Sequence, residues 1–72
     1  MKVSYDREAD ALYVSLNEER PDGVVEVRDE VNLDVTADGR IIGIEILDAS
    51  RKIDLKTLLS YNLDEETVQS IF

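Results

Sequence analysis

Apolar and polar residues alternate along much of the chain before residue 50, most clearly from residue 31 to residue 46. Asp38-Gly39 lies inside that stretch and predicts a type I′ hairpin turn, because both central residues of that turn need a positive φ. Pairing outward puts six apolar residues on one face: Val35 opposite Ile42, Leu33 opposite Ile44, and Val31 opposite Ile46. The other face receives Asp34 opposite Gly43 and Asn32 opposite Glu45. A slip of one residue would mix the two sets, so turn chemistry and hydrophobic period predict the same register.

Two shorter alternating segments, residues 1–5 and 11–16, predict an N-terminal hairpin. The loop 7–10 joins them, which places Tyr5 opposite Leu12 and Val3 opposite Val14. Asp6 is expected to accept hydrogen bonds from the backbone of the turn that follows it, as Asx turns do.

The middle of the chain leaves two interpretations open. Residues 17–23 contain Pro21 and end in Asp22-Gly23, which predicts a loop. In residues 24–36 one parity is shared by five apolar residues, interrupted by Asp29-Glu30: Val25, Val27, Val31, Leu33 and Val35. This pattern predicts either one long strand with a kink or bulge, or two strands with a tight bend. We favour the kinked strand, followed by a last strand over 40–47 that is the most apolar of all.

The spacing of apolar residues changes to a helical period after residue 53. Asp54 is a suitable N-cap for a helix carrying Leu55 and Leu58, and Asp64 for a second turn that leads to Ile71-Phe72. We therefore predict a single small α+β domain over residues 1–72. A four-stranded antiparallel β-meander (1–48) has one face covered by a C-terminal helical segment (53–72), in the order β-β-β-β-α.

Charge and composition narrow the functional classes. The formal net charge is −9, from 17 acidic and 8 basic residues, which argues against a nucleic-acid partner, since phosphates need Lys and Arg contacts. It favours solubility and, more weakly, a basic protein partner. No apolar run has the length of a membrane span or of a signal peptide, so we expect no membrane association. The absence of cysteine fits a cytoplasmic protein.

Several short segments resemble Domain of Unknown Function family 2283, a family of small bacterial and archaeal proteins. The most specific is Gly43-Ile44-Glu45-Ile46-Leu47-Asp48-Ala49-Ser50. Tyr5-Asp6, Asp10-Ala11-Leu12-Tyr13, Asn32-Leu33-Asp34 and Asp38-Gly39-Arg40 also match. The resemblance covers roughly residues 3–50 and implies no established activity. It also implies, more weakly, a likeness to antitoxin partners of small ribonuclease-like toxins.

The chemistry available to the side chains is limited. The chain has no histidine and no cysteine, so the commonest general base, the commonest metal ligand and thiol chemistry are all absent. We predict no catalytic residues, no cofactor and no enzymatic activity. A weak site for a divalent cation at Asp34, Glu45 and Asp48 is the candidate for a metal, because hard cations prefer oxygen ligands. The alternative is that these carboxylates are ordinary solvent-facing, turn or cap residues, with Arg28 and Arg40 as ion-pair partners.

Ile41 and Leu47 predict an interface. By parity both lie away from the apolar face, beside a last strand that a meander would leave at the sheet edge with unpaired backbone groups. We therefore expect a homodimer through this edge. The alternative is that the loop 17–23 or the C-terminal Ile71-Phe72 covers them within one chain.

The functional hypothesis is a non-catalytic protein-interaction module, antitoxin-like in neutralising a basic partner. The alternative is a domain that binds a divalent cation or a small ligand weakly.

Overall fold

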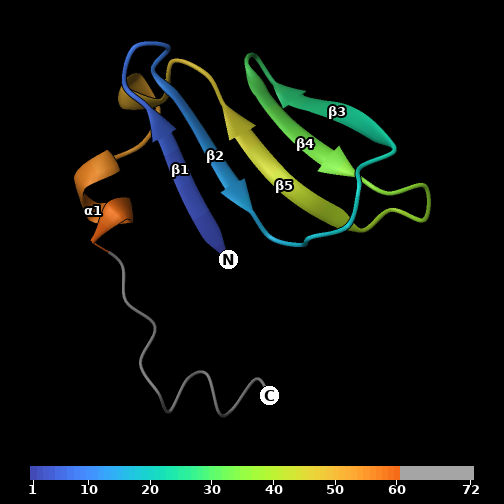
Figure 1. Cartoon of the computed structure of the whole chain (residues 1–72). Coiled ribbons are helices and arrows are strands. Elements are labelled where there is room, and N and C mark those ends of the chain that lie inside the picture. Colours follow the sequence, from blue (N-terminus) through green and yellow to red (C-terminus); the bar gives the residue numbers. More distant parts are fainter. Residues whose placement is uncertain (61–72) are drawn as a thin grey trace.

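The computed structural model describes residues 1–60 of the 72-residue chain. They form one antiparallel sheet followed by two short helices (Figure 1). In chain order the elements are β1 (Lys2–Asp6), β2 (Ala11–Ser15), β3 (Gly23–Arg28), β4 (Val31–Val35), β5 (Ile41–Ile46), the 3₁₀ helix η1 (Ala49–Arg51) and α1 (Leu55–Leu59). The predicted α+β class is confirmed in this broad sense, whereas the predicted number and order of strands are wrong.

The segment 24–36 makes two strands, so the favoured kinked strand is wrong and the tight bend is correct. Arg28 pairs with Val31, which leaves only Asp29 and Glu30 to reverse the chain. Glu30 has a left-handed backbone with φ 61°. A separate irregularity lies within β3 itself, because the register of the β3–β4 pair shifts between Glu26 and Arg28.

The order of strands across the sheet is β1-β2-β5-β4-β3, so the sheet is not a simple meander. The last strand, β5, lies in the centre, with β2 on one side and β4 on the other (Figure 1). Leu12 of β2 pairs with Ile46, and Val14 pairs with Ile44. The edges are β1 and β3, and our prediction that the last strand is an edge is therefore wrong. The most apolar strand occupies the position where both of its sides are paired.

The β4–β5 hairpin has the predicted register except next to the turn. Leu33–Ile44, Val31–Ile46, Asp34–Gly43 and Asn32–Glu45 pair as expected. Val35, however, pairs with Ile41 and not with Ile42, because Ile42 is an extra residue that forms a bulge.

The turn of this hairpin also differs from the type I′ prediction. Gly39 has φ 88°, but Asp38 is not left-handed. Gly39 N–H donates to Thr36 O over 3.0 Å, and Thr36 N–H donates to Arg40 O over 2.9 Å. The loop therefore has three residues with the glycine at the left-handed position, which is the next most common hairpin type.

The N-terminal hairpin and the start of the helix follow the sequence closely. Tyr5 pairs with Leu12 and Val3 with Val14, as predicted. Asp6 Oδ1 accepts hydrogen bonds from the N–H groups of Glu8 (3.0 Å) and Ala9 (3.3 Å).

Asp54 caps α1 by accepting from Thr57 N–H at 3.2 Å. The predicted second helical turn from Asp64 to Phe72 lies outside the described residues, so only the first part of the predicted cover can be compared with the structure.

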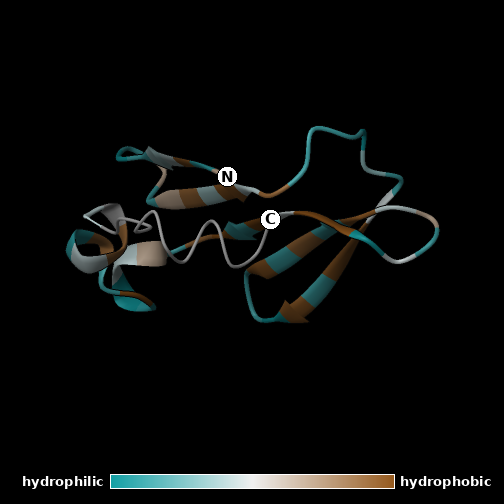
Figure 2. Ribbon diagram, turned by 90° about the horizontal axis from the view of Figure 1, so that it is seen from below, coloured by the Kyte–Doolittle hydropathy of each residue, from teal (hydrophilic) through white to brown (hydrophobic). Residues whose placement is uncertain are grey.

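Apolar residues face one side of the sheet, and Figure 2 shows apolar and polar bands alternating along the strands. The fully buried apolar side chains of the described region are Leu12 and Ala49, at 1% and 0% exposure, with Ile42 at 3%. Helix α1 lies beside β1, at the opposite side of the molecule from β3 (Figure 1). Every residue of β2 is at least partly buried, while every residue of β3 is exposed.

Candidate functional site

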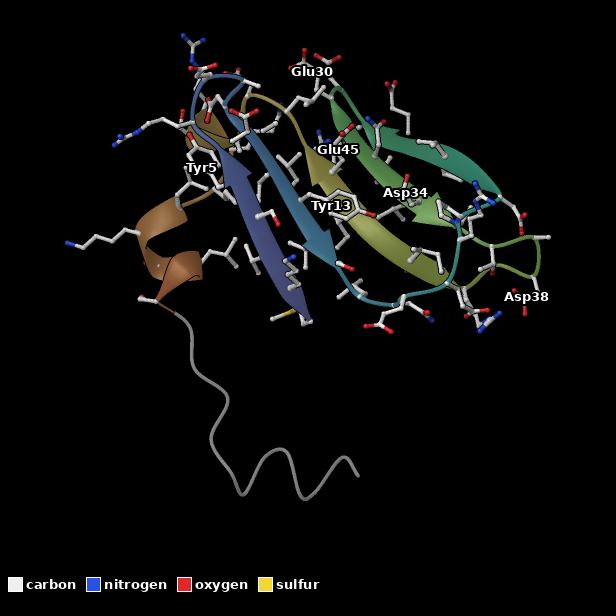
Figure 3. The ribbon with its side chains drawn as sticks, viewed as in Figure 1. Tyr5, Tyr13, Glu30, Asp34, Asp38 and Glu45 are labelled. Carbon is white, nitrogen blue, oxygen red and sulfur yellow. The ribbon has the colours of Figure 1, made fainter. Side chains whose placement is uncertain are left out.

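A polar network crosses the centre of the sheet on the face opposite Leu12. Tyr13 of β2 donates its hydroxyl to Asp34 Oδ2 of β4 at 2.8 Å, so the side chain spans β5 (Figure 3). It can do so because Gly43 of β5 has no side chain. A Cβ at that position would overlap the Tyr13 hydroxyl oxygen. Glycine is thus required here by the close approach of an aromatic side chain, as is typical of glycine within a strand.

A second polar pair, of an amide and a carboxylate, lies on the same face of the sheet. Asn32 Nδ2 donates to Glu45 Oε1 at 3.3 Å, between directly paired residues of β4 and β5. The hydrogen bond to Asp34 raises the pKa of Tyr13, with burial and the charges of Asp34 and Glu45 adding to the effect. The phenol therefore stays protonated and acts as a donor. This arrangement links three strands, and it offers no activated nucleophile or base.

The three carboxylates of the predicted cation site are not brought together as a group. Asp34 and Glu45 lie on the same face of the sheet and each accepts a hydrogen bond (Figure 3). Asp48 lies beyond the end of β5, where it precedes η1 with a left-handed φ of 53° and forms an ion pair with Arg51 at 3.8 Å. Within residues 1–60, no three acidic side chains are placed to hold an ion. The geometry does not support the cation site.

Arg40 pairs elsewhere than expected. Its guanidinium forms an ion pair with Glu19 and another with Asp38, the latter at 3.2 Å. These hydrogen bonds raise the pKa of Arg40, with the larger effect from Glu19. The pair connects the β2–β3 loop to the β4–β5 turn, so the predicted pairing of Arg40 with the sheet-face carboxylates is wrong.

A second cluster, at the β1–β2 turn, joins distant parts of the chain. Asp10 accepts hydrogen bonds from the hydroxyls of Tyr5 and Ser50, both at 2.7 Å, and from Ser50 N–H at 3.0 Å. These hydrogen bonds lower the pKa of Asp10. The Ser50 hydroxyl has the largest effect, followed by the Tyr5 hydroxyl and then by Ser50 N–H. The sequence placed Asp10 at the end of the loop 7–10, and its link to Ser50 depends on the tertiary structure. The cluster anchors η1 to the β1–β2 hairpin.

The β3 edge is the most exposed part of the sheet. Val24, Val25 and Val27 are 65%, 49% and 54% exposed. A hollow of about 440 Å³ lies at the C-terminal end of this strand. Its lining residues are Arg28, Asp29, Val31, Ile46, Lys52 and Ile53. Three exposed valines on an edge strand are the feature that the sequence reasoning missed, because it joined β3 and β4 into one strand.

The predicted interface residues lie elsewhere. Ile41 is 44% exposed and pairs with Val35 at the bulge. Leu47 follows β5, is half-buried, and its N–H donates to Glu30 O at 2.9 Å. Because β5 is central, neither residue marks a free sheet edge.

The fold and its polar network define a small domain with a five-stranded antiparallel sheet. The family model described as "Protein of unknown function (DUF2283)" matches residues 2–50, and the chain belongs to this family. The match begins in β1 and ends at Ser50, so it includes both polar clusters. No curated protein and no solved structure matches the chain. Neither helix in residues 1–60 has the length and apolar character that a membrane crossing needs.

Proposed function

We propose that this protein is a non-catalytic protein-interaction module that binds its partner by adding a strand to the β3 edge. The observation that carries the proposal is the exposure of all six residues of β3, three of them valines. An edge strand offers a row of unpaired N–H and C=O groups, and proteins usually protect such edges with charges or a cover. In strand-addition recognition, a partner segment pairs with such an exposed sheet edge through main-chain hydrogen bonds.

The opposite edge supports this assignment by contrast. Each edge strand carries two exposed charges, Lys2 and Asp6 on β1 and Glu26 and Arg28 on β3, but α1 lies beside β1 alone (Figure 1). Only Val3 and Tyr5 are large apolar side chains within β1, and both are half-buried. Among the described strands, β3 is therefore the edge suited to a partner.

The non-catalytic part of the proposal rests on side-chain chemistry. The 72 residues include no histidine and no cysteine. The tyrosines and carboxylates of the two polar clusters donate to and accept from one another. These groups hold strands together and do not present a reactive atom.

The test compares an edge variant with a matched control. Val25→Lys puts a charge on β3, and Ser4→Lys puts the same charge on an exposed position of β1. Binding of a purified partner to the tagged wild-type protein and to each tagged variant is measured. Amide hydrogen exchange of this chain is then measured with and without the partner. Protection of β3 amides in the complex, with binding lost only in Val25→Lys, is expected. Binding that is indifferent to Val25→Lys would contradict the proposal.

An antitoxin-like role with a basic partner is a second candidate, favoured by the net charge of −9. Opposite charge speeds association and increases specificity. The test is expression of the neighbouring gene with and without this chain. A basic product that is toxic alone and harmless in combination would support this role, and unrelated, harmless neighbours would contradict it.

A further inference from the structure

We propose that the strand added to β3 is the β3 strand of a second copy of this chain, giving a homodimer with one continuous sheet. This inference rests on the proposed function, because it names the partner of the same edge. It is carried by three observations on β3: its exposure, its local charge, and the way its residues match themselves in antiparallel orientation.

The local charge distinguishes β3 from the rest of the molecule. The whole chain carries −9, so two copies repel each other over most of their surfaces. Between residues 20 and 28, however, Arg20 and Arg28 balance Asp22 and Glu26. A basic partner would gain little from this neutral stretch, whereas a second acidic copy can approach it without local repulsion.

Symmetry limits the possible registers. A twofold axis perpendicular to the sheet keeps both apolar faces on one side, and it places one residue opposite its own copy. With Glu26 on the axis, two carboxylates are opposed, which is unfavourable. With Val24 on the axis, Asp22 lies opposite Glu26 of the partner subunit, which again opposes like charges. With Val25 on the axis, Asp22 lies level with Arg28 of the partner subunit, and this favourable pair occurs twice.

A register centred on Val27 is less favourable than the one centred on Val25. It would also place Glu26 opposite Arg28 of the partner subunit twice, but Val27 is the extra residue of the β3–β4 irregularity, and Val25 would then face Asp29 of the partner subunit. The register centred on Val25 uses the regular part of the strand. It places Gly23 opposite Val27 of the partner subunit, and the space around Gly23 is open, because a Cβ added there would have no neighbouring atom within 4 Å. Val25 pairs with Leu33 within its own subunit, so the twofold contact extends the apolar face.

The first experiment measures mass. Sedimentation equilibrium of the full chain at micromolar concentration is expected to give twice the chain mass for the wild type and for Ser4→Lys. Val25→Lys is expected to give the mass of a single chain, with an unchanged circular dichroism spectrum. A wild type that is monomeric, or a dimer that persists in Val25→Lys, would overturn the inference.

The second experiment does not depend on the lysine variant folding. Because the chain has no cysteine, a single Val25→Cys substitution gives one thiol per copy. Directly opposed residues of antiparallel strands have Cα atoms about 4.5–5.5 Å apart, which is within disulfide reach. Mild oxidation is expected to convert most of Val25→Cys to a covalent dimer and to leave Ser4→Cys monomeric. Equal cross-linking of the two variants would overturn the inference.

The two proposals fail separately. Suppose that the wild type is monomeric, that a different protein protects the β3 amides, and that binding of this protein is lost in Val25→Lys. The self-pairing inference is then wrong, and the proposed interaction module stands. If β3 amides are protected by no partner, including a second copy, both proposals fail.

Discussion

The two edge regions of this sheet, β1–β2 and β3, have the same alternation of apolar and polar residues but differ in how deeply their apolar side chains are buried. On the β1–β2 side, Leu12 is 1% exposed, and Ala49 of η1 is completely buried. On the β3 side, Val25 pairs with Leu33 and so shares the face of Leu12, yet it is 49% exposed. Alternation therefore selects a face of the sheet, and the covering elements decide which part of that face becomes core. The buried side chains lie around β2 and η1, and the β3 edge stays exposed.

The largest expected difference between the two sides comes from truncating one side chain on each. Leu12→Ala should lower the free energy of unfolding by about 2–5 kcal/mol, because it leaves a cavity in the small core. Val24→Ala, on the exposed edge, should change it by about 0.5 kcal/mol or less. Urea unfolding of both variants followed by circular dichroism measures the difference. Equal losses would show that β3 is as well packed as β2.

The glycines provide a second matched pair. Gly43→Ala should cost about 1–3 kcal/mol, because the new Cβ displaces the Tyr13 hydroxyl and also lies 3.1 Å from Val14 O. Gly23→Ala meets no atom within 4 Å and should be neutral or slightly stabilising. Thermal unfolding of the two alanine variants checks this. A neutral Gly43→Ala would mean that Tyr13 does not need to cross β5.

The Tyr13–Asp34 hydrogen bond should contribute less than either packing effect. Tyr13→Phe removes the donor and should cost about 0.5–1 kcal/mol, since the bond is only partly buried. Tyr5→Phe, which removes the equivalent hydrogen bond to Asp10 on the β1 edge, is expected to cost a similar amount. A double-mutant cycle of Tyr13→Phe with Asp34→Asn isolates the coupling between the two side chains. Additive losses would contradict the hydrogen bond.

The smallest effect is the acid titration of Asp10 on the β1–β2 side. Its pKa lies below the usual value of 3.8, because Ser50 and Tyr5 donate to its carboxylate. A lowered pKa means that the stabilisation by Asp10 is complete above the unfolded pKa and is lost as the pH falls through the folded value. An NMR titration of the side-chain carboxyl carbon should show a midpoint below 3.8 that rises in Ser50→Ala. A midpoint unchanged by Ser50→Ala would contradict the link between η1 and the β1–β2 turn.

Local sequence signals predicted the local structure well. The β1–β2 register, most of the β4–β5 register, the Asp6 turn and the Asp54 cap all follow from side chains close together along the chain. Each depends on a period of two, a glycine or a capping oxygen, which act over a few residues. The candidate cation site was predicted less well, because it combined parity within a hairpin with Asp48, whose position depends on η1.

The sequence by itself determined the family, the faces of the strands and the pairing inside two hairpins. The tertiary structure alone decided that β5 enters the sheet between β2 and β4, and therefore that β3 is an edge. Alternation specifies which face a residue occupies but not which strand lies beside it, so both arrangements satisfy the same pattern. The choice follows from burial: a central β5 pairs Ile44 and Ile46 with apolar residues on both sides, which an edge position cannot do.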